Sequence, residues 1–139
     1  MRELAPEGPC YQAGTLSGNP LATAAGLAVL GELAAPGTYE RLEELGAALE
    51  AAVADSGLPV TVNRVGSMLT PFFADGPVQD YGDATGSDTS AYGRLARALL
   101  AGGVYPPPSQ VEAWFVGLTH DEAAIGAVHD ALARAAATG

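Results

Sequence analysis

The sequence contains no lysine, and acidic residues far outnumber basic ones. Its 6 basic residues are all arginines and stand against 16 aspartates and glutamates, which gives a formal net charge of −10. A surface that binds nucleic-acid phosphates or an anionic membrane needs clustered positive charge. The composition therefore predicts neither a nucleic-acid partner nor a membrane partner.

Disulfides, long apolar runs and a leader segment are lacking as well. The single cysteine, Cys10, cannot form a disulfide within the chain. The longest apolar stretch, Leu21–Leu30, is too short to span a bilayer, and no basic, apolar signal opens the sequence. We therefore expect a cytoplasmic protein.

What the chain does contain suits one small domain. It has 139 residues, and 48% of them are hydrophobic, which is enough for a single core. Many of these are alanines, which bury little area each. We therefore expect modest stability.

The first expected helix is Pro20–Leu33. Asn19 can cap it, Pro20 suits its first position, and Pro36 and Gly37 stop the chain from continuing as a helix. Its residues are apolar nearly all round, a pattern typical of a helix buried on every side.

A second helix is expected from Thr38, as its cap, to about Asp55. Its apolar positions recur at helical spacing and line one stripe: Leu42, Leu45, Leu49 and Val53.

Two strands follow, Val60–Val65 and Met68–Ala74. The short connection through Gly66 and Ser67 predicts an antiparallel hairpin. Pro71 cannot donate a hydrogen bond to a neighbouring strand, so the second strand is expected at a sheet edge or bulged there.

The segment Asp75–Ser87 is rich in glycine and aspartate and predicts a solvated loop. Its aspartates do not have the spacing of a calcium-binding loop. Asp88 can cap a third helix that runs to about Ala101 and ends at Gly102-Gly103. The buried stripe expected for that helix is Tyr92, Leu95, Leu99 and Leu100.

A third strand is expected at Val111–Leu118. Thr119 and Glu122 fit a capping box for a last helix that runs to about Ala136. Its buried positions are expected to be Ile125, Val128 and Leu132. Hairpin strands with helices on one face of the sheet indicate a two-layer α+β domain, with an antiparallel sheet of about three strands.

The turn at Gly14 and Thr15 is the most informative local feature. It offers two backbone N–H groups and a hydroxyl in a flexible segment just before a helix, a set that suits a phosphate. The alternative is a plain loop that leads into a core helix, because glycine turns are common.

The string that contains this turn, Tyr11-Gln12-Ala13-Gly14-Thr15-Leu16-Ser17-Gly18-Asn19-Pro20, closely resembles glutamate-1-semialdehyde 2,1-aminomutases. These are pyridoxal-phosphate enzymes of the class-III aminotransferase group. Further strings resemble the same family, in the family's order: Val62-Asn63-Arg64-Val65-Gly66-Ser67-Met68, Ser87-Asp88-Thr89, Gly103-Val104-Tyr105, Pro107-Pro108-Ser109-Gln110 and Glu112-Ala113-Trp114-Phe115. Pro106 departs from the family, in which leucine is common at that position.

The resemblance implies a place in a larger fold-type-I enzyme, of which this chain is similar to the C-terminal part only. Residues 1–19 would be a lead-in that belongs to the large domain, residues 20–36 a long interdomain helix, and residues 37–139 the small C-terminal domain. The apolar surface of the interdomain helix would then face partners elsewhere in the parent protein.

The resemblance also implies an isomerase that converts glutamate-1-semialdehyde to 5-aminolevulinate, for tetrapyrrole synthesis. In this family the chemistry begins with a lysine Schiff base to the cofactor. Since this chain has no lysine, it would supply no catalytic residue and would be inactive alone. Two alternatives stay open: a free-standing interaction or regulatory module derived from such an enzyme, and a fragment of another class-III aminotransferase.

Three site residues are carried over from the family. Gly14 and Thr15 would bind the phosphate of pyridoxal or pyridoxamine phosphate in the neighbouring subunit of a homodimer, formed through residues 11–33. Glu112 would lie at the edge of the substrate site, where many related aminotransferases use an arginine. No cofactor is expected to bind this chain alone.

No other arrangement of residues predicts chemistry. His120 and His129 lack the neighbours that a zinc site needs, so no metal is expected. Arg64, on a strand, is expected to make a surface or interdomain ion pair.

Overall fold

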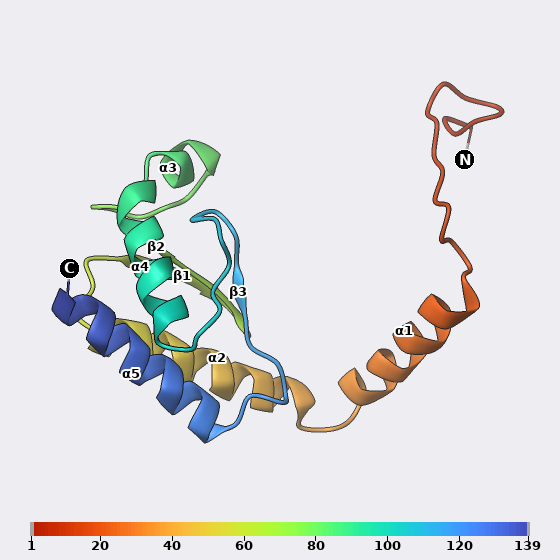
Figure 1. Cartoon of the computed structure of the whole chain (residues 1–139). Helices are drawn as coiled ribbons and strands as arrows, with labels where there is room; N and C mark the ends of the chain where they lie inside the picture. Colours follow the sequence, from red (N-terminus) through yellow and green to blue (C-terminus); the bar gives the residue numbers. More distant parts are fainter. Residues whose placement is uncertain (1, 139) are drawn as a thin grey trace. The chain divides into compact units, whose positions relative to one another are not determined.

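The computed structural model describes residues 2–138, and the contacts within it divide the chain into two units, Met1–Pro36 and Gly37–Gly139. Each unit is described by itself (Figure 1).

The first unit contains helix α1 (Pro20–Leu33), with the bounds that the sequence predicts. The Asn19 side chain accepts a hydrogen bond from the backbone N–H of Ala22 at 3.1 Å, which confirms its role as the cap. The expectation of burial is wrong for this structure, because no residue of α1 is buried and Leu21 and Leu27 are 80% and 66% exposed. Capping and proline set the helix locally, whereas burial requires a second layer of structure.

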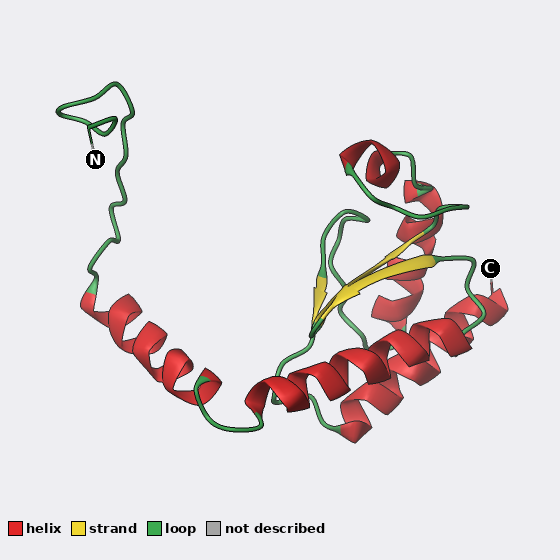
Figure 2. Ribbon diagram, turned by 180° about the vertical axis from the view of Figure 1, so that it is seen from behind, coloured by secondary structure: helices red, strands yellow, loops and turns green. Residues whose placement is uncertain are grey.

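The second unit is the predicted α+β domain. Its sheet is antiparallel in the order β1 (Thr61–Val65), β2 (Met68–Phe72), β3 (Trp114–Phe115). Figure 2 shows β1 and β2 lying over α2 (Thr38–Asp55), with which both strands are in contact. The helix α5 (Glu122–Thr138) packs on α2 and on α4 (Thr89–Ala101).

The core of this unit forms where the apolar stripes of the three long helices meet the sheet. Leu69 of β2 is 1% exposed, and Leu99 and Leu132, from α4 and α5, are 0% exposed. The predicted α4 stripe is wrong only at Leu100, which is half exposed, and Ala91 takes its place. The other buried members of the cluster are Leu45, Leu49, Ala52, Val53, Tyr92, Leu95, Trp114, Val116, Ala131 and Ala135.

The hairpin tip approaches α2 closely, and this contact depends on a glycine. A side chain at Gly46 of α2 would collide with the carbonyl oxygen of Gly66 in the turn between β1 and β2. Gly66 itself has φ of 57°, a left-handed conformation that favours glycine. The hairpin confirms the prediction of an antiparallel pair joined through Gly66-Ser67.

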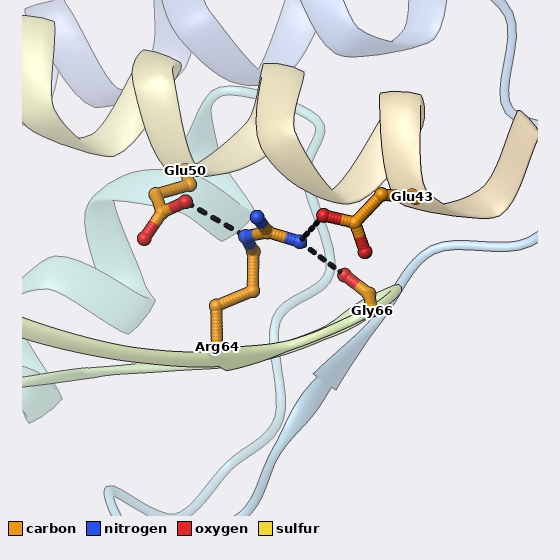
Figure 3. Close-up of polar contacts among 4 residues, drawn as sticks. All are labelled: Glu43, Glu50, Arg64 and Gly66. Atoms are coloured by element: carbon orange, nitrogen blue, oxygen red, sulfur yellow. Dashed lines mark hydrogen bonds and ion pairs between the residues drawn. The ribbon is translucent and has the colours of Figure 1, made fainter. Parts of the chain in front are cut away.

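Arg64 of β1 also stabilises the contact between the hairpin and α2 (Figure 3). Its guanidinium donates to Glu50 and Glu43 of α2, both at 2.7 Å, and to the Gly66 carbonyl at 2.8 Å. The hydrogen bond to Glu50, followed by that to Glu43, raises the pKa of Arg64 above its ordinary value. The predicted ion pair therefore exists, but it lies within this unit and joins β1 to α2.

Pro71 lies in the central strand β2, at a position where β2 has a neighbouring strand on one side only. The sequence predicted that the second strand lies at a sheet edge or is bulged at Pro71, whereas β2 lies between β1 and β3. However, the pairing of β2 with β3 covers only Met68 and Leu69, so Pro71 lies beyond it. Its carbonyl accepts from the Gln110 side chain at 2.8 Å, and a residue's N and C=O share one edge of a strand. The missing N–H of Pro71 therefore costs no hydrogen bond to β1.

Several predicted boundaries need correction. Gly37, not Thr38, is the residue before α2, and Thr38 is buried inside the helix start. Asp121, rather than Thr119, caps α5, because its carboxylate accepts from the Ala124 N–H at 2.8 Å. The third strand is only Trp114–Phe115, since the residues before it form a turn.

The segment Asp75–Ser87, which was predicted as a solvated loop, is more ordered than that prediction implies. It contains a short helix, α3 (Tyr81–Thr85), and buried Val78. Asn63 of β1 donates to the Val78 carbonyl at 2.7 Å, and Thr61 donates to carbonyls of the same segment. These side-chain hydrogen bonds attach the segment to β1, which local composition could not predict.

Candidate functional site

Glu112 lies between α4 and β3, at the open edge of β2. Its side chain is exposed and makes no ion pair with any residue from 2 to 138. Its backbone N–H donates to the Ser109 carbonyl at 3.2 Å, so it stands in a turn rather than on the predicted strand. An unpaired carboxylate on a turn is available to a cationic group.

Two buried polar side chains, Tyr92 and Gln110, connect this turn to the core by hydrogen bonds. Tyr92 of α4 is 2% exposed, and its hydroxyl donates to the Pro107 carbonyl at 2.7 Å. The same hydroxyl accepts from the indole N–H of Trp114 at 3.1 Å. Burial raises the pKa of Tyr92, the bond from Trp114 opposes this rise, and the negative charge of Glu112 adds to it.

Gln110 supplies the second attachment. It is 3% exposed, and its amide donates to the Pro71 carbonyl at 2.8 Å while accepting from the Phe73 N–H at 3.4 Å. One side chain thus satisfies the edge of β2 where β3 has ended, as a further strand would.

Gly14 and Thr15 lie in the first unit, in an exposed segment outside helix and strand. The Gly14 carbonyl accepts from the Ser17 N–H at 3.0 Å, which forms a tight turn. A Cβ on Gly14 would meet the Ser17 hydroxyl, a side-chain group that can rotate away, so the turn does not require a glycine at this position. Within the described part of the chain, no group accepts from the N–H of Gly14 or Thr15.

These donors fit a phosphate. Two free backbone N–H groups and the hydroxyls of Thr15 and Ser17 are close in sequence, and no acidic residue lies between Gly8 and Leu30. The structure places Gly14 and Thr15 in one unit and Glu112 in the other.

Within residues 2–138, no group of histidine, cysteine or acidic side chains could hold a metal ion. His120 accepts a hydrogen bond from the Gly117 N–H at 3.0 Å through Nδ1. No single helix in that range is long and apolar enough to cross a membrane, although α1 and α2 taken together reach the required length and composition.

The sequence did not single out Tyr92 and Gln110 as parts of this site. Tyr92 fits an ordinary core stripe, and Gln110 lies in a proline-rich segment. Their partners are 15 and 39 residues away along the chain. Only the buried hydroxyl and the buried amide, each of which demands a partner, could have pointed to them.

Comparison with known proteins identifies the relatives of this chain, although no family model matches it. It is 56% identical over 126 residues to a glutamate-1-semialdehyde 2,1-aminomutase from Myxococcus xanthus, an alignment that covers 88% of this chain and 29% of the relative. It is 51% identical over 140 residues to the enzyme of the same name from Thermus thermophilus, covering 97% of this chain and 33% of the relative. The chain thus spans about a third of the length of these curated relatives, at their C-terminal end.

Solved structures give the same fold. An omega-transaminase from Sphaerobacter thermophilus superposes with a TM-score of 0.73 at 25% identity, over 94% of this chain and 31% of that one. A β-phenylalanine aminotransferase from Variovorax paradoxus gives a TM-score of 0.67 at 28% identity, over 91% of this chain and 30% of that one. A transaminase with PLP bound, at 23% identity, gives 0.68 over 95% of this chain and 30% of that one. The likeness to a part of fold-type-I transaminases is confirmed.

Proposed function

We propose that this chain, a homologue of the C-terminal third of glutamate-1-semialdehyde 2,1-aminomutases, forms the small-domain wall of such an enzyme's active site. The observation that carries the proposal is identity of 50–56% over nearly the whole chain with several of these enzymes. The reaction would be the isomerisation of glutamate-1-semialdehyde to 5-aminolevulinate, in the cytoplasm.

Glu112 is proposed to face the substrate. Its carboxylate is exposed and unpaired within residues 2–138, so it can pair with an amino group. It would also repel the α-carboxylate of an ordinary amino acid, which an arginine would attract. Glu112 would therefore favour a substrate whose amino group has no neighbouring carboxylate over an ordinary α-amino acid.

Gly14 and Thr15 are proposed to bind a phosphate across a homodimer formed through residues 11–33. Pyridoxal phosphate, when bound, would supply the amine-carrying and electron-withdrawing chemistry that the isomerisation needs. In this proposal, residues 1–19 belong with the large domain and 20–36 form the interdomain helix. The exposed leucines of α1 would be covered by those partners.

The chain is expected to be inactive alone, because it has no lysine to form a Schiff base. The test is to mix it with pyridoxal phosphate, reduce with borohydride and measure the mass. An unchanged mass, apart from modification of the chain's α-amino group, is expected. Turnover of the semialdehyde by the chain alone would overturn the proposal.

A chimeric enzyme tests whether this chain can form the small-domain wall of an aminomutase active site. The first two-thirds of the Thermus thermophilus enzyme would be joined to this chain in place of its own last third. We expect the chimera to form 5-aminolevulinate, whereas the truncated two-thirds should not. Glu112→Gln in the chimera should lower kcat/KM at least about tenfold, since a lost charged contact costs about 1.5–3 kcal/mol.

The phosphate contact has a readout independent of activity. In the chimera, Thr15→Val removes a hydroxyl donor at similar volume, so more cofactor should be lost on gel filtration. Thr119→Val, at an exposed threonine outside the proposed dimer interface, is the matched control. A chimera that retains cofactor but transfers amino groups between substrates would instead favour another class-III aminotransferase. A soluble, monodisperse chain that binds a different protein would favour an interaction module.

A further inference from the structure

We propose that Gln110 and Tyr92 are positioning residues, which hold the turn that carries Glu112 at a fixed place on the sheet edge. The inference rests on the proposed role of Glu112 and adds two residues that nothing in the family resemblance assigns. It is based on three attachments, at Pro107, Gln110 and Trp114, that enclose Glu112 on both sides along the chain.

Short-range structure does not fix this turn. The strand β3 has only two residues, and residues 104–113 lie outside helix and strand. Figure 1 shows this connection running from the end of α4 to β3. The local bonds are those of the Glu112 and Val111 N–H groups to Ser109, at 3.2 and 3.4 Å. Such a segment would be mobile without longer-range contacts.

The long-range contacts of the turn use buried polar groups. A buried amide or phenol is costly unless hydrogen-bonded. Gln110 and the Tyr92 hydroxyl meet that requirement only through the backbone of Pro71, Phe73 and Pro107 and the indole of Trp114. Moving the turn would break these bonds inside the core, so the turn is fixed by the core itself.

Gln110 and Trp114, two residues before and two residues after Glu112, are buried, yet Glu112 is exposed and forms no ion pair among residues 2–138. A turn that merely connects α4 to β3 needs no such fixation at its exposed point. A carboxylate that must meet an amine in one geometry does, because small misplacements lower rates strongly.

The primary test uses the 139-residue chain itself. Backbone ¹⁵N relaxation should give Val111–Ala113 order parameters of about 0.85 in the wild type, falling below about 0.6 in Gln110→Met and Tyr92→Phe. Met keeps the volume of Gln without its hydrogen bonds, and Phe removes one oxygen. Gln12→Met, in the exposed lead-in, is the matched control. Order parameters that stay unchanged in both site variants would overturn the proposal.

A double-mutant cycle in the chimera separates a positioning role of Gln110 from an effect on overall stability. Gln110→Met should lower kcat/KM about tenfold or more when Glu112 is present, mainly through KM. In the Glu112→Gln background the same change should have almost no further effect. Equal losses in both backgrounds would mean that Gln110 acts only on stability, and the proposal would be wrong.

The two proposals can fail separately. An inactive chimera that folds would refute the proposed function, and the relaxation data would still decide whether Gln110 and Tyr92 fix the turn. An active chimera without coupling between Gln110 and Glu112 would refute the positioning role alone.

Discussion

Helices α1 and α2 follow each other in the sequence but have opposite relations to a core. The 14 residues of α1 are mostly apolar, and none is buried. The 18 residues of α2 are more polar, yet they bury Leu45, Leu49 and Val53 among others. Apolar content alone therefore does not bury a helix. Burial follows when a stripe at helical spacing meets a sheet or another helix.

The contrast is sharpest for leucines. Leu132 is fully buried in the second unit, whereas Leu27 of α1 is 66% exposed. Leu132→Ala should lower the free energy of unfolding by about 2–5 kcal/mol, because it leaves a cavity. Leu27→Ala should change it by less than about 0.5 kcal/mol. Urea unfolding, followed through the fluorescence of Trp114, measures both. Equal effects would remove the distinction between the two units.

Glycines give a second comparison, with opposite signs. In α2, Gly46→Ala would force the hairpin turn away from the helix and should cost about 1–3 kcal/mol. In α1, nothing lies within 4 Å of a Cβ built on Gly26. Gly26→Ala should therefore increase helicity, by about 0.5–1 kcal/mol of helix propensity, without moving the urea midpoint. Circular dichroism and urea titration test the pair, and a stabilising Gly46→Ala would contradict the close contact.

The helix caps form a third comparison of smaller size. The Asp88 carboxylate accepts from the N–H groups of Ser90 and Ala91, both at 2.9 Å, at the start of α4. Asp88→Ala should cost about 1 kcal/mol of unfolding free energy. Asn19→Ala removes the corresponding cap of α1 and should only lower helicity. A shift of the urea midpoint by Asn19→Ala would show that α1 takes part in the cooperative core.

The free energy of unfolding should depend on alkaline pH through Tyr92, which lies in the core of the second unit. Because burial raises the pKa of Tyr92, the folded state keeps the phenol protonated where the unfolded chain, with a pKa of about 10, begins to lose the proton. This contribution is fully present below about pH 10 and is lost as the pH rises through the folded-state pKa.

The corresponding experiment compares urea midpoints at neutral and alkaline pH. Tyr92→Phe should flatten the alkaline decline, whereas Tyr105→Phe, at a side chain that is 84% exposed, should leave it in place. An identical decline in the wild type and in Tyr92→Phe would show that Tyr92 is not the group responsible.

The sequence predicted most elements of the fold because their signals are local. Caps, prolines and apolar spacing predicted α1, α2, α4 and the hairpin closely. The third strand was predicted too long, since alternating residues cannot show that the pairing with β2 stops at Leu69. Arg64 was expected to form an ion pair, but its partners on α2 became clear only from the fold.

The residues of the candidate site also differ in whether the sequence or only the fold indicates them. Gly14, Thr15 and Glu112 stand out through the family's motifs, and their roles remain proposals. Gln110 lies in one of the strings that resemble the family, but neither motif nor spacing could show the buried hydrogen bonds of Tyr92 and Gln110, because their partners come from distant parts of the chain. Tertiary structure alone brings those groups together.

Hydrogen exchange across the whole chain tests the contrast between the two units most directly. If the second unit carries the core, amides in the middle of α2, α4 and α5 should exchange at least about 10³-fold more slowly than in an unfolded chain. Amides of α1 should remain within about tenfold of the unfolded rate. Protection of α1 equal to that of α2, in the monomeric chain, would contradict the account.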